Sequence, residues 1–216
     1  MYTYLLISTE LVAVSHLSMA IVLFIYASRS VAYKAQAWVL MLISLIYAFA
    51  LSFLVFSKDV PDVGMLNPFM LIFLLVTSFL LSINPLGMLM PGYLQLGRMV
   101  RYASPAIVVV SLYLLGMLAG STVVGILLRI IALLLSFGYI FNIIFVPHLR
   151  LRRHTLPKNV VSYAMLLGIV QLIFVICTIR FSVPLFIVYE VLFAAVSIML
   201  CGCIINPLMQ AQPYPE

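Results

Sequence analysis

Seven apolar stretches separated by short loops limit the fold of this sequence more than any other feature. The stretches span residues 4–27, 37–56, 69–90, 105–119, 123–146, 160–179 and 184–205. A helix needs about 20 apolar residues to cross a bilayer. The stretch at 105–119 is short by itself, but residues 105–146 are too long for one crossing and suit two, with turn-like residues at 120–122. The sequence therefore predicts an all-α, polytopic membrane protein with seven transmembrane helices.

The composition agrees with a lipid environment. Of the 216 residues, 66% are hydrophobic and 7% are charged, which leaves too few polar groups to cover a water-soluble globule. The first stretch has no positively charged n-region and no Ala-x-Ala-like cleavage site, so we expect a retained helix. The predicted organisation is one transmembrane domain, residues 1–206, followed by a short cytoplasmic tail, residues 207–216.

Basic residues fall mainly on alternate loops and predict the orientation. The first, third and fifth loops contain no acidic residue and carry Arg29, Lys34, Arg98, Arg101, Arg150, Arg152, Arg153 and Lys158. The other loops carry Lys58, Asp59, Asp62 and Arg180. Because cytoplasmic loops retain an excess of Lys and Arg, the N-terminus is predicted outside and the C-terminus inside, in the cell inner membrane. This asymmetry and anionic lipid account for the net charge of +6, so we expect no direct nucleic-acid binding.

Three ionisable residues lie within predicted helices, where an unpaired charge is costly. Glu10, Arg129 and Glu190 are each six residues from the outer end of their stretch, roughly 9 Å deep. If their helices are neighbours, Arg129 can pair with one or both carboxylates in a polar pocket open to the outside. Phe186 and Phe193 share a helical face with Glu190 and would give this pocket apolar walls suited to a small ligand. We predict that these five residues bind a ligand; a structural ion pair, or side chains that reach the interface, is the alternative.

The sequence gives no indication of an enzyme, a metal site or another cofactor. No nucleophile has a partnered base. A catalytic zinc site typically needs three ligands in one place, whereas Glu10, His16 and Glu190 are spread over two helices. A retinal protein is excluded because every lysine lies in a loop.

One pattern supports a more specific interpretation. A short basic loop from Ser28 to Lys34 precedes an apolar helix, an acidic outer loop and a helix that ends at Met90-Pro91-Gly92, before Arg98 and the helix at Pro105. Over about half of the chain this pattern resembles the membrane-embedded N-terminal region of Bacteroidetes-type transcription regulators. In that family a multi-helix sensor precedes a cytoplasmic AraC-like helix-turn-helix domain.

The resemblance implies a signal-input module that detects a small ligand from outside and controls a cytoplasmic DNA-binding output. These residues contain no such output domain, so a longer chain or a separate partner would provide it. The alternative is a small-solute transporter of the cytoplasmic membrane, which should show a polar path to both faces. The three charges within the helices all lie toward the outside, and this favours the sensor.

Overall fold

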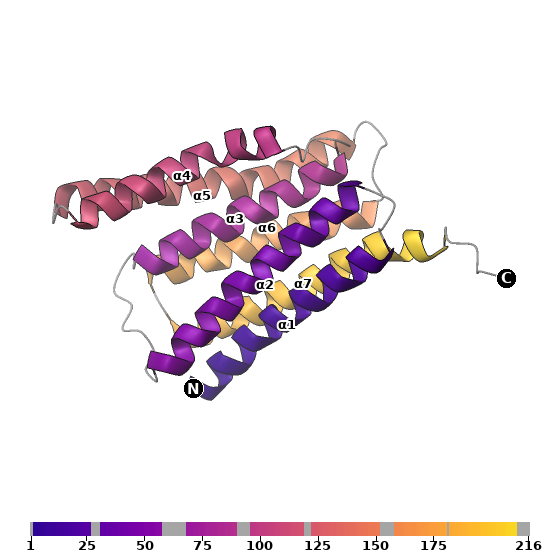
Figure 1. Ribbon diagram of the computed structural model, residues 1–216, viewed down its shortest axis with the longest axis horizontal. Helices are drawn as coiled ribbons and strands as arrows, with labels where there is room; N and C mark the ends of the chain where they lie inside the picture. The colour runs from indigo at the N-terminus through magenta and orange to yellow at the C-terminus, as the bar shows by residue number, and fades with distance from the viewer. Residues whose placement is uncertain are drawn as a thin grey trace.

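The computed structural model describes residues 2–26, 31–57, 68–89, 96–118, 122–151, 158–180 and 182–210. These residues form the helices α1 (Tyr2–Tyr26), α2 (Val31–Ser57), α3 (Pro68–Leu89), α4 (Leu96–Leu118), α5 (Thr122–Leu151), α6 (Lys158–Ile179) and α7 (Val183–Gln210). The helices lie side by side and alternate in direction, so α1 begins at one end of the bundle and α7 ends at the other (Figure 1). We call the end at which α1 begins the outer end, following the predicted orientation.

The surface of this bundle is suited to lipid. Large apolar side chains are exposed along the helices, including Phe49 at 76% and Phe56 at 86%, whereas soluble proteins rarely expose large apolar patches. Among the described residues, six helices are long and apolar enough to cross a membrane; the apolar run of α3, Met70–Ile83, is shorter. The prediction of a multi-pass helical membrane protein is therefore confirmed. The seventh crossing and the orientation stay predictions.

Helix α4 differs from its predicted bounds. It begins at Leu96 rather than Pro105, so the proline lies inside the helix. Proline has no N–H, and in a helix it cannot bond the carbonyl four residues earlier, here that of Arg101. The Ser104 hydroxyl donates to this carbonyl at 2.8 Å and satisfies it instead. A proline preceded by a compensating serine therefore continues the helix, and α4 reaches the length of a full crossing.

Helix α7 is longer than predicted. It continues to Gln210, so residues 207–210, which we assigned to the cytoplasmic tail, are helical. Residues 211–216 lie outside the described part of the chain. The basic loop residues Arg29, Arg152 and Arg153, the outer-loop residues at 58–62 and the motif at 90–92 lie outside it as well.

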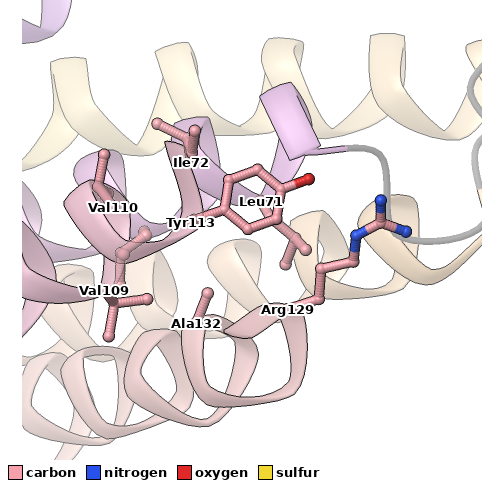
Figure 2. Close-up of a pocket in the computed structure, with 8 residues that line it drawn as sticks. Leu71, Ile72, Val109, Val110, Tyr113, Arg129 and Ala132 are labelled. Atoms are coloured by element: carbon pink, nitrogen blue, oxygen red, sulfur yellow. The ribbon is translucent and has the colours of Figure 1, made fainter. Parts of the chain in front are cut away.

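Helices α3 and α5 connect two packed groups, because both contact α4 on one side and α6 on the other. On one side of the bundle, α4 contacts α5 and α3 (Figure 1). A small cluster fills their interface and consists of Leu75, Ala106, Val109, Ala132 and Tyr139. A cavity of about 10 Å³ lies between the same three helices, and Arg129 is among its lining residues (Figure 2).

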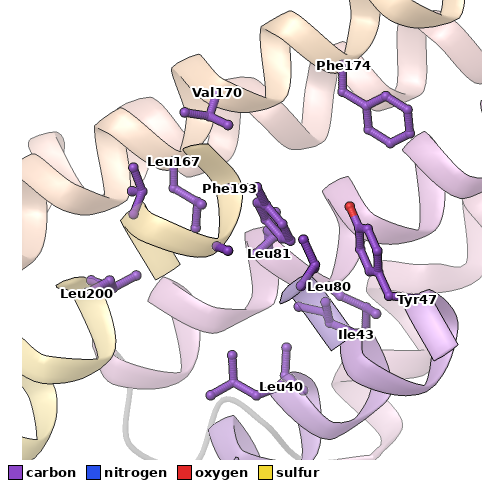
Figure 3. Packing of buried hydrophobic residues seen from close by; sticks show 14 of the residues in the cluster. Leu40, Ile43, Tyr47, Leu80, Leu81, Leu167, Val170, Phe174, Phe193 and Leu200 are labelled. Atoms are coloured by element: carbon purple, nitrogen blue, oxygen red, sulfur yellow. The ribbon is translucent and has the colours of Figure 1, made fainter. Parts of the chain in front are cut away.

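The main core lies on the other side of α3, where α1, α2, α6 and α7 pack together. Its largest fully buried side chains include Tyr47, Phe174, Tyr189 and Phe193. Figure 3 shows Tyr47, Phe174 and Phe193 in this core among aliphatic side chains of α2, α3, α6 and α7. The core thus combines aromatic rings that carry hydroxyl groups with apolar packing, and the candidate site lies beside it.

Candidate functional site

Glu190 joins α7 to α1 through two hydrogen bonds. Its side chain is fully buried. The Ser8 hydroxyl donates a short hydrogen bond to Oε2, and the Thr9 hydroxyl donates to Oε1 at 2.9 Å. We call these three residues the Glu190 cluster. Because an ionisable group in hydrocarbon is costly unless it has polar partners, the two hydroxyls explain how α7 carries a carboxyl group inside the bundle.

The two hydroxyls of the Glu190 cluster have a second acceptor within their own helix. The carbonyl oxygen of Leu5 lies 3.1 Å from the Ser8 hydroxyl and 2.8 Å from the Thr9 hydroxyl. A hydroxyl has one hydrogen, so each must divide it between Leu5 and Glu190 or give it to one of them. The link between α1 and α7 can therefore break without leaving a hydroxyl donor unsatisfied.

An aromatic layer lies next to this cluster. The His16 ring stacks on Phe193 at a centroid distance of 4.9 Å, and Phe193 stacks on Tyr189 at 5.6 Å. Phe174 also stacks on Tyr189, with 4.6 Å between the two ring centroids. The hydroxyls of Tyr47 and Tyr189 are hydrogen-bonded at 3.0 Å. Ring side chains from four helices, α1, α2, α6 and α7, therefore contact one another at this level.

Several polar atoms beside the aromatic layer have no hydrogen bond within the described residues. His16 donates from Nδ1 to the Val12 carbonyl at 2.8 Å, whereas its Nε2 has no partner. Gln171 is fully buried and lies near the Tyr189 hydroxyl, but its amide makes no hydrogen bond of normal geometry. The Ser197 hydroxyl is also without a partner. Buried polar atoms usually have a partner, so these groups indicate places where water or a ligand can bind.

Arg129 is not part of this site, contrary to our expectation. Helix α5 contacts α3, α4 and α6, but among the described residues it contacts neither α1 nor α7. The predicted pairing of Arg129 with Glu10 or Glu190 is therefore wrong for the described structure. The three residues do lie at a similar depth along their helices, but α3 and α6 separate α5 from the α1–α7 interface.

Glu10 also lies outside the Glu190 cluster, although it follows Thr9 directly. Its side chain is exposed on the surface of α1. Successive residues of a helix point about 100° apart. Thr9 faces α7, and Glu10 therefore faces away from it. Of the three residues in the predicted polar layer, only Glu190 therefore belongs to the site.

The aromatic part of the prediction agrees better with the structure. Phe186 and Phe193 are buried on α7 with Glu190, and Phe186 also packs against Tyr189. The expected opening to the outside is absent from the described residues around Glu190, because its side chain has no exposed surface. Whether these residues bind a ligand stays a prediction, and binding at Glu190 would require α1 and α7 to separate.

Sequence reasoning missed the two hydroxyl partners of Glu190 and the tyrosine pair. One signal for α1 was present, because Thr9 and His16 are seven residues apart and thus share a helical face. Both are buried, at 1% and 0% exposure. Tyr47 and Tyr189 carried no comparable signal, since a tyrosine inside an apolar helix is typical of ordinary core packing.

The described residues contain no group of three or more His, Cys, Asp or Glu side chains that could hold a metal ion. The Glu190 cluster and the aromatic layer offer hydrogen bonding and aromatic packing at the meeting point of α1 and α7. No protein-family model, curated protein or solved structure matches this chain.

Proposed function

We propose that this protein is a signal-input module of the cell membrane in which the Glu190 cluster is the switching element. The observation that carries the proposal is the direct bonding of a buried α7 carboxyl group to two hydroxyls of α1. A ligand that donates hydrogen bonds to Glu190 would compete with Ser8 and Thr9. The hydroxyls would then bond to the Leu5 carbonyl, so the separation of α1 from α7 would cost little free energy.

Helix α7 would carry the signal to the other side of the membrane. It begins at Val183, close to the outer end, and runs without interruption to Gln210 at the opposite end. A ligand that binds one arrangement of two packed helices more tightly than another shifts the population between them. The inner end of α7 would then move relative to its neighbours and reposition an attached or separate cytoplasmic output. The resemblance to AraC-like regulators supports a DNA-binding output.

A cysteine-labelling experiment tests this coupling without knowledge of the ligand. Gly97 on α4 and Gly202 on α7 are exposed, and nothing lies within 4 Å of a Cβ built at either position. Spin labels at these two positions, in a protein without its native cysteines, report the distance between the inner ends of the two helices. Removing the cluster's donors by Ser8→Ala with Thr9→Val should shift this distance by about 2 Å or broaden its distribution.

Ser18→Ala is the matched control for this experiment. Ser18 is an exposed α1 residue whose hydroxyl bonds to the Val14 carbonyl of its own helix at 2.8 Å. Its removal should leave the label distance unchanged. An unchanged distance in the Ser8 and Thr9 variant as well would rule out coupling between the Glu190 cluster and the inner end of α7.

Transport of a small solute is the second candidate, and one observation favours it. Buried polar side chains also lie deeper in the bundle than Glu190. His16 and Ser197 are each about 21 Å from the start of their helices. Ser197 and Gln36 line a cavity of about 10 Å³ nearer the inner end, and a transporter needs polar groups that reach toward both faces.

Reconstitution in liposomes separates the two candidates. A transporter should move protons or a labelled solute across the liposome membrane, and Glu190→Gln should block that flux. A signal-input module should show the change in label distance and no flux. If solute flux depends on Glu190 and the label distance does not change, the protein is a transporter and the sensor proposal is wrong.

A further inference from the structure

The cavity between α3, α4 and α5 is a second site, separate from the Glu190 cluster. Its lining is apolar except for two side chains, Tyr113 of α4 and Arg129 of α5 (Figure 2). The apolar lining residues are Leu71, Ile72, Leu75, Val109, Val110 and Ala132. Tyr113 is 5% exposed and Arg129 is partly buried. The cavity itself measures about 10 Å³, which is about the minimum volume that one water molecule needs.

Two hydrogen-bonding groups at this cavity have no partner within the described residues: the Tyr113 hydroxyl and Nε of Arg129. Figure 2 shows the hydroxyl end of Tyr113 directed toward the side on which the Arg129 guanidinium lies. Both groups can donate hydrogen bonds, and the guanidinium is always charged. Together they match the oxygen atoms of an anion.

The acidic residues that the structure describes cannot supply this anion. They are Glu10 on α1 and Glu190 on α7, and α5 contacts neither helix within the described residues. A guanidinium inside a membrane protein normally has an acidic or carbonyl partner, or reaches the headgroup level. The described residues therefore supply no counter-charge for Arg129.

The two donors lie near the outer end of the bundle. Tyr113 is five residues from the end of α4, roughly 8 Å, and Arg129 is seven residues from the start of α5, roughly 10 Å. Both distances are measured from the outer end. Arginine side chains reach several ångströms toward the interface, so the Arg129 guanidinium can contact a lipid phosphate. Leu112 and Leu127, close by in sequence, are 47% and 55% exposed and face lipid.

We propose that Arg129 and Tyr113 form a binding site for an anionic phospholipid of the outer leaflet. The Arg129 guanidinium donates to the phosphate oxygens, a geometry for which its planar fork is suited. The buried Tyr113 hydroxyl donates to a water in the cavity, and this water donates to the same phosphate group. An acyl chain lies over the exposed apolar residues beside the cavity, such as Leu112 and Leu127. The proposal is independent of the Glu190 cluster and of either function proposed above.

The test is native mass spectrometry of the purified full chain in detergent with defined lipids. The wild-type protein should retain phosphatidylglycerol over phosphatidylcholine by about fivefold to tenfold. Arg129→Leu should abolish this preference, and Tyr113→Phe, which removes only the hydroxyl, should reduce it severalfold. Arg180→Gln is the matched control, because Arg180 is an exposed arginine at the same end of the bundle. It should keep the preference.

Two further measurements make the outcome decisive. Phosphatidylglycerol should raise the melting temperature of the wild type and of Arg180→Gln, but not that of Arg129→Leu. Inorganic phosphate alone should not raise it. Equal stabilisation by inorganic phosphate would overturn the lipid assignment in favour of a free anion. If Tyr113→Phe and Arg129→Leu both retain the wild-type lipid preference, the site does not exist.

Discussion

Removing the two hydroxyl donors of the Glu190 cluster should destabilise the bundle more than removing the carboxyl group itself. Ser8→Ala with Thr9→Val deletes both donors and leaves a fully buried carboxyl group without a partner. A buried polar group without a partner costs about 1–3 kcal/mol, and more if it is charged. We expect this variant to lose about 2–3 kcal/mol of the free energy of unfolding.

Glu190→Leu should be much milder for a reason that the structure supplies. Without the carboxyl group, both hydroxyls still have the Leu5 carbonyl as acceptor, at 3.1 and 2.8 Å. Replacing the carboxyl group by an apolar side chain therefore leaves no buried donor unsatisfied, which avoids the main cost of losing a hydrogen-bond partner. The expected loss is about 0–1 kcal/mol, and the triple variant of Ser8, Thr9 and Glu190 should recover most of what the hydroxyl variant lost.

Equilibrium unfolding in mixed micelles measures these differences. Ser18→Ala, which removes a hydroxyl from the exposed face of α1, should stay within about 0.5 kcal/mol of the wild type. Strictly additive effects in the triple variant would show that the three side chains do not interact. A Glu190→Leu loss larger than that of the hydroxyl variant would refute the role of Leu5 as alternative acceptor.

Two more predictions concern the bundle as a whole. In intact cells an impermeant thiol reagent should label Arg180→Cys and not Gly97→Cys, because these exposed positions lie at opposite ends of the bundle; the reverse pattern would contradict the predicted orientation. Gly168→Ala should cost about 1–3 kcal/mol in unfolding free energy, since a Cβ there would lie 2.5 Å from Cγ1 of Ile144. Gly138→Ala, with nothing within 4 Å of its Cβ, is the control, and equal losses would argue against close α5–α6 packing.

The helices were predictable because lipid imposes a simple rule on length and polarity. A segment that crosses hydrocarbon must be helical and apolar over about 20 residues, and the sequence shows this directly. The start of α4 was not predictable by the same rule. Pro105 suggested a helix start, and only the bond from the Ser104 hydroxyl to the Arg101 carbonyl shows why the helix continues through it.

The candidate site was predictable only in part, because depth along a helix does not specify which helices are neighbours. Counting residues placed Glu10, Arg129 and Glu190 at one level. The packing order of the helices, which depends on the shapes of whole helical faces, separates α5 from α7. Phe193 could be found because it lies three residues from Glu190 on the same helix. Ser8 could not, since nothing in its own helix indicates a partner 182 residues away.

The distance in sequence between Thr9 and Glu190 also means that the two partners of this hydrogen bond are synthesised at different times. They are 181 residues apart, so a ribosome adding 5–20 residues per second makes Glu190 roughly 10–40 s after Thr9. During this interval α1 is in the membrane without α7, and its hydroxyls can bond the Leu5 carbonyl. Within the described residues Glu190 has no hydrogen-bond partner other than Ser8 and Thr9, and both donors are already in place when α7 inserts. A nascent chain can therefore pause before α7 without exposing an unsatisfied hydroxyl donor to lipid, and the insertion of α7 then forms the link to α1.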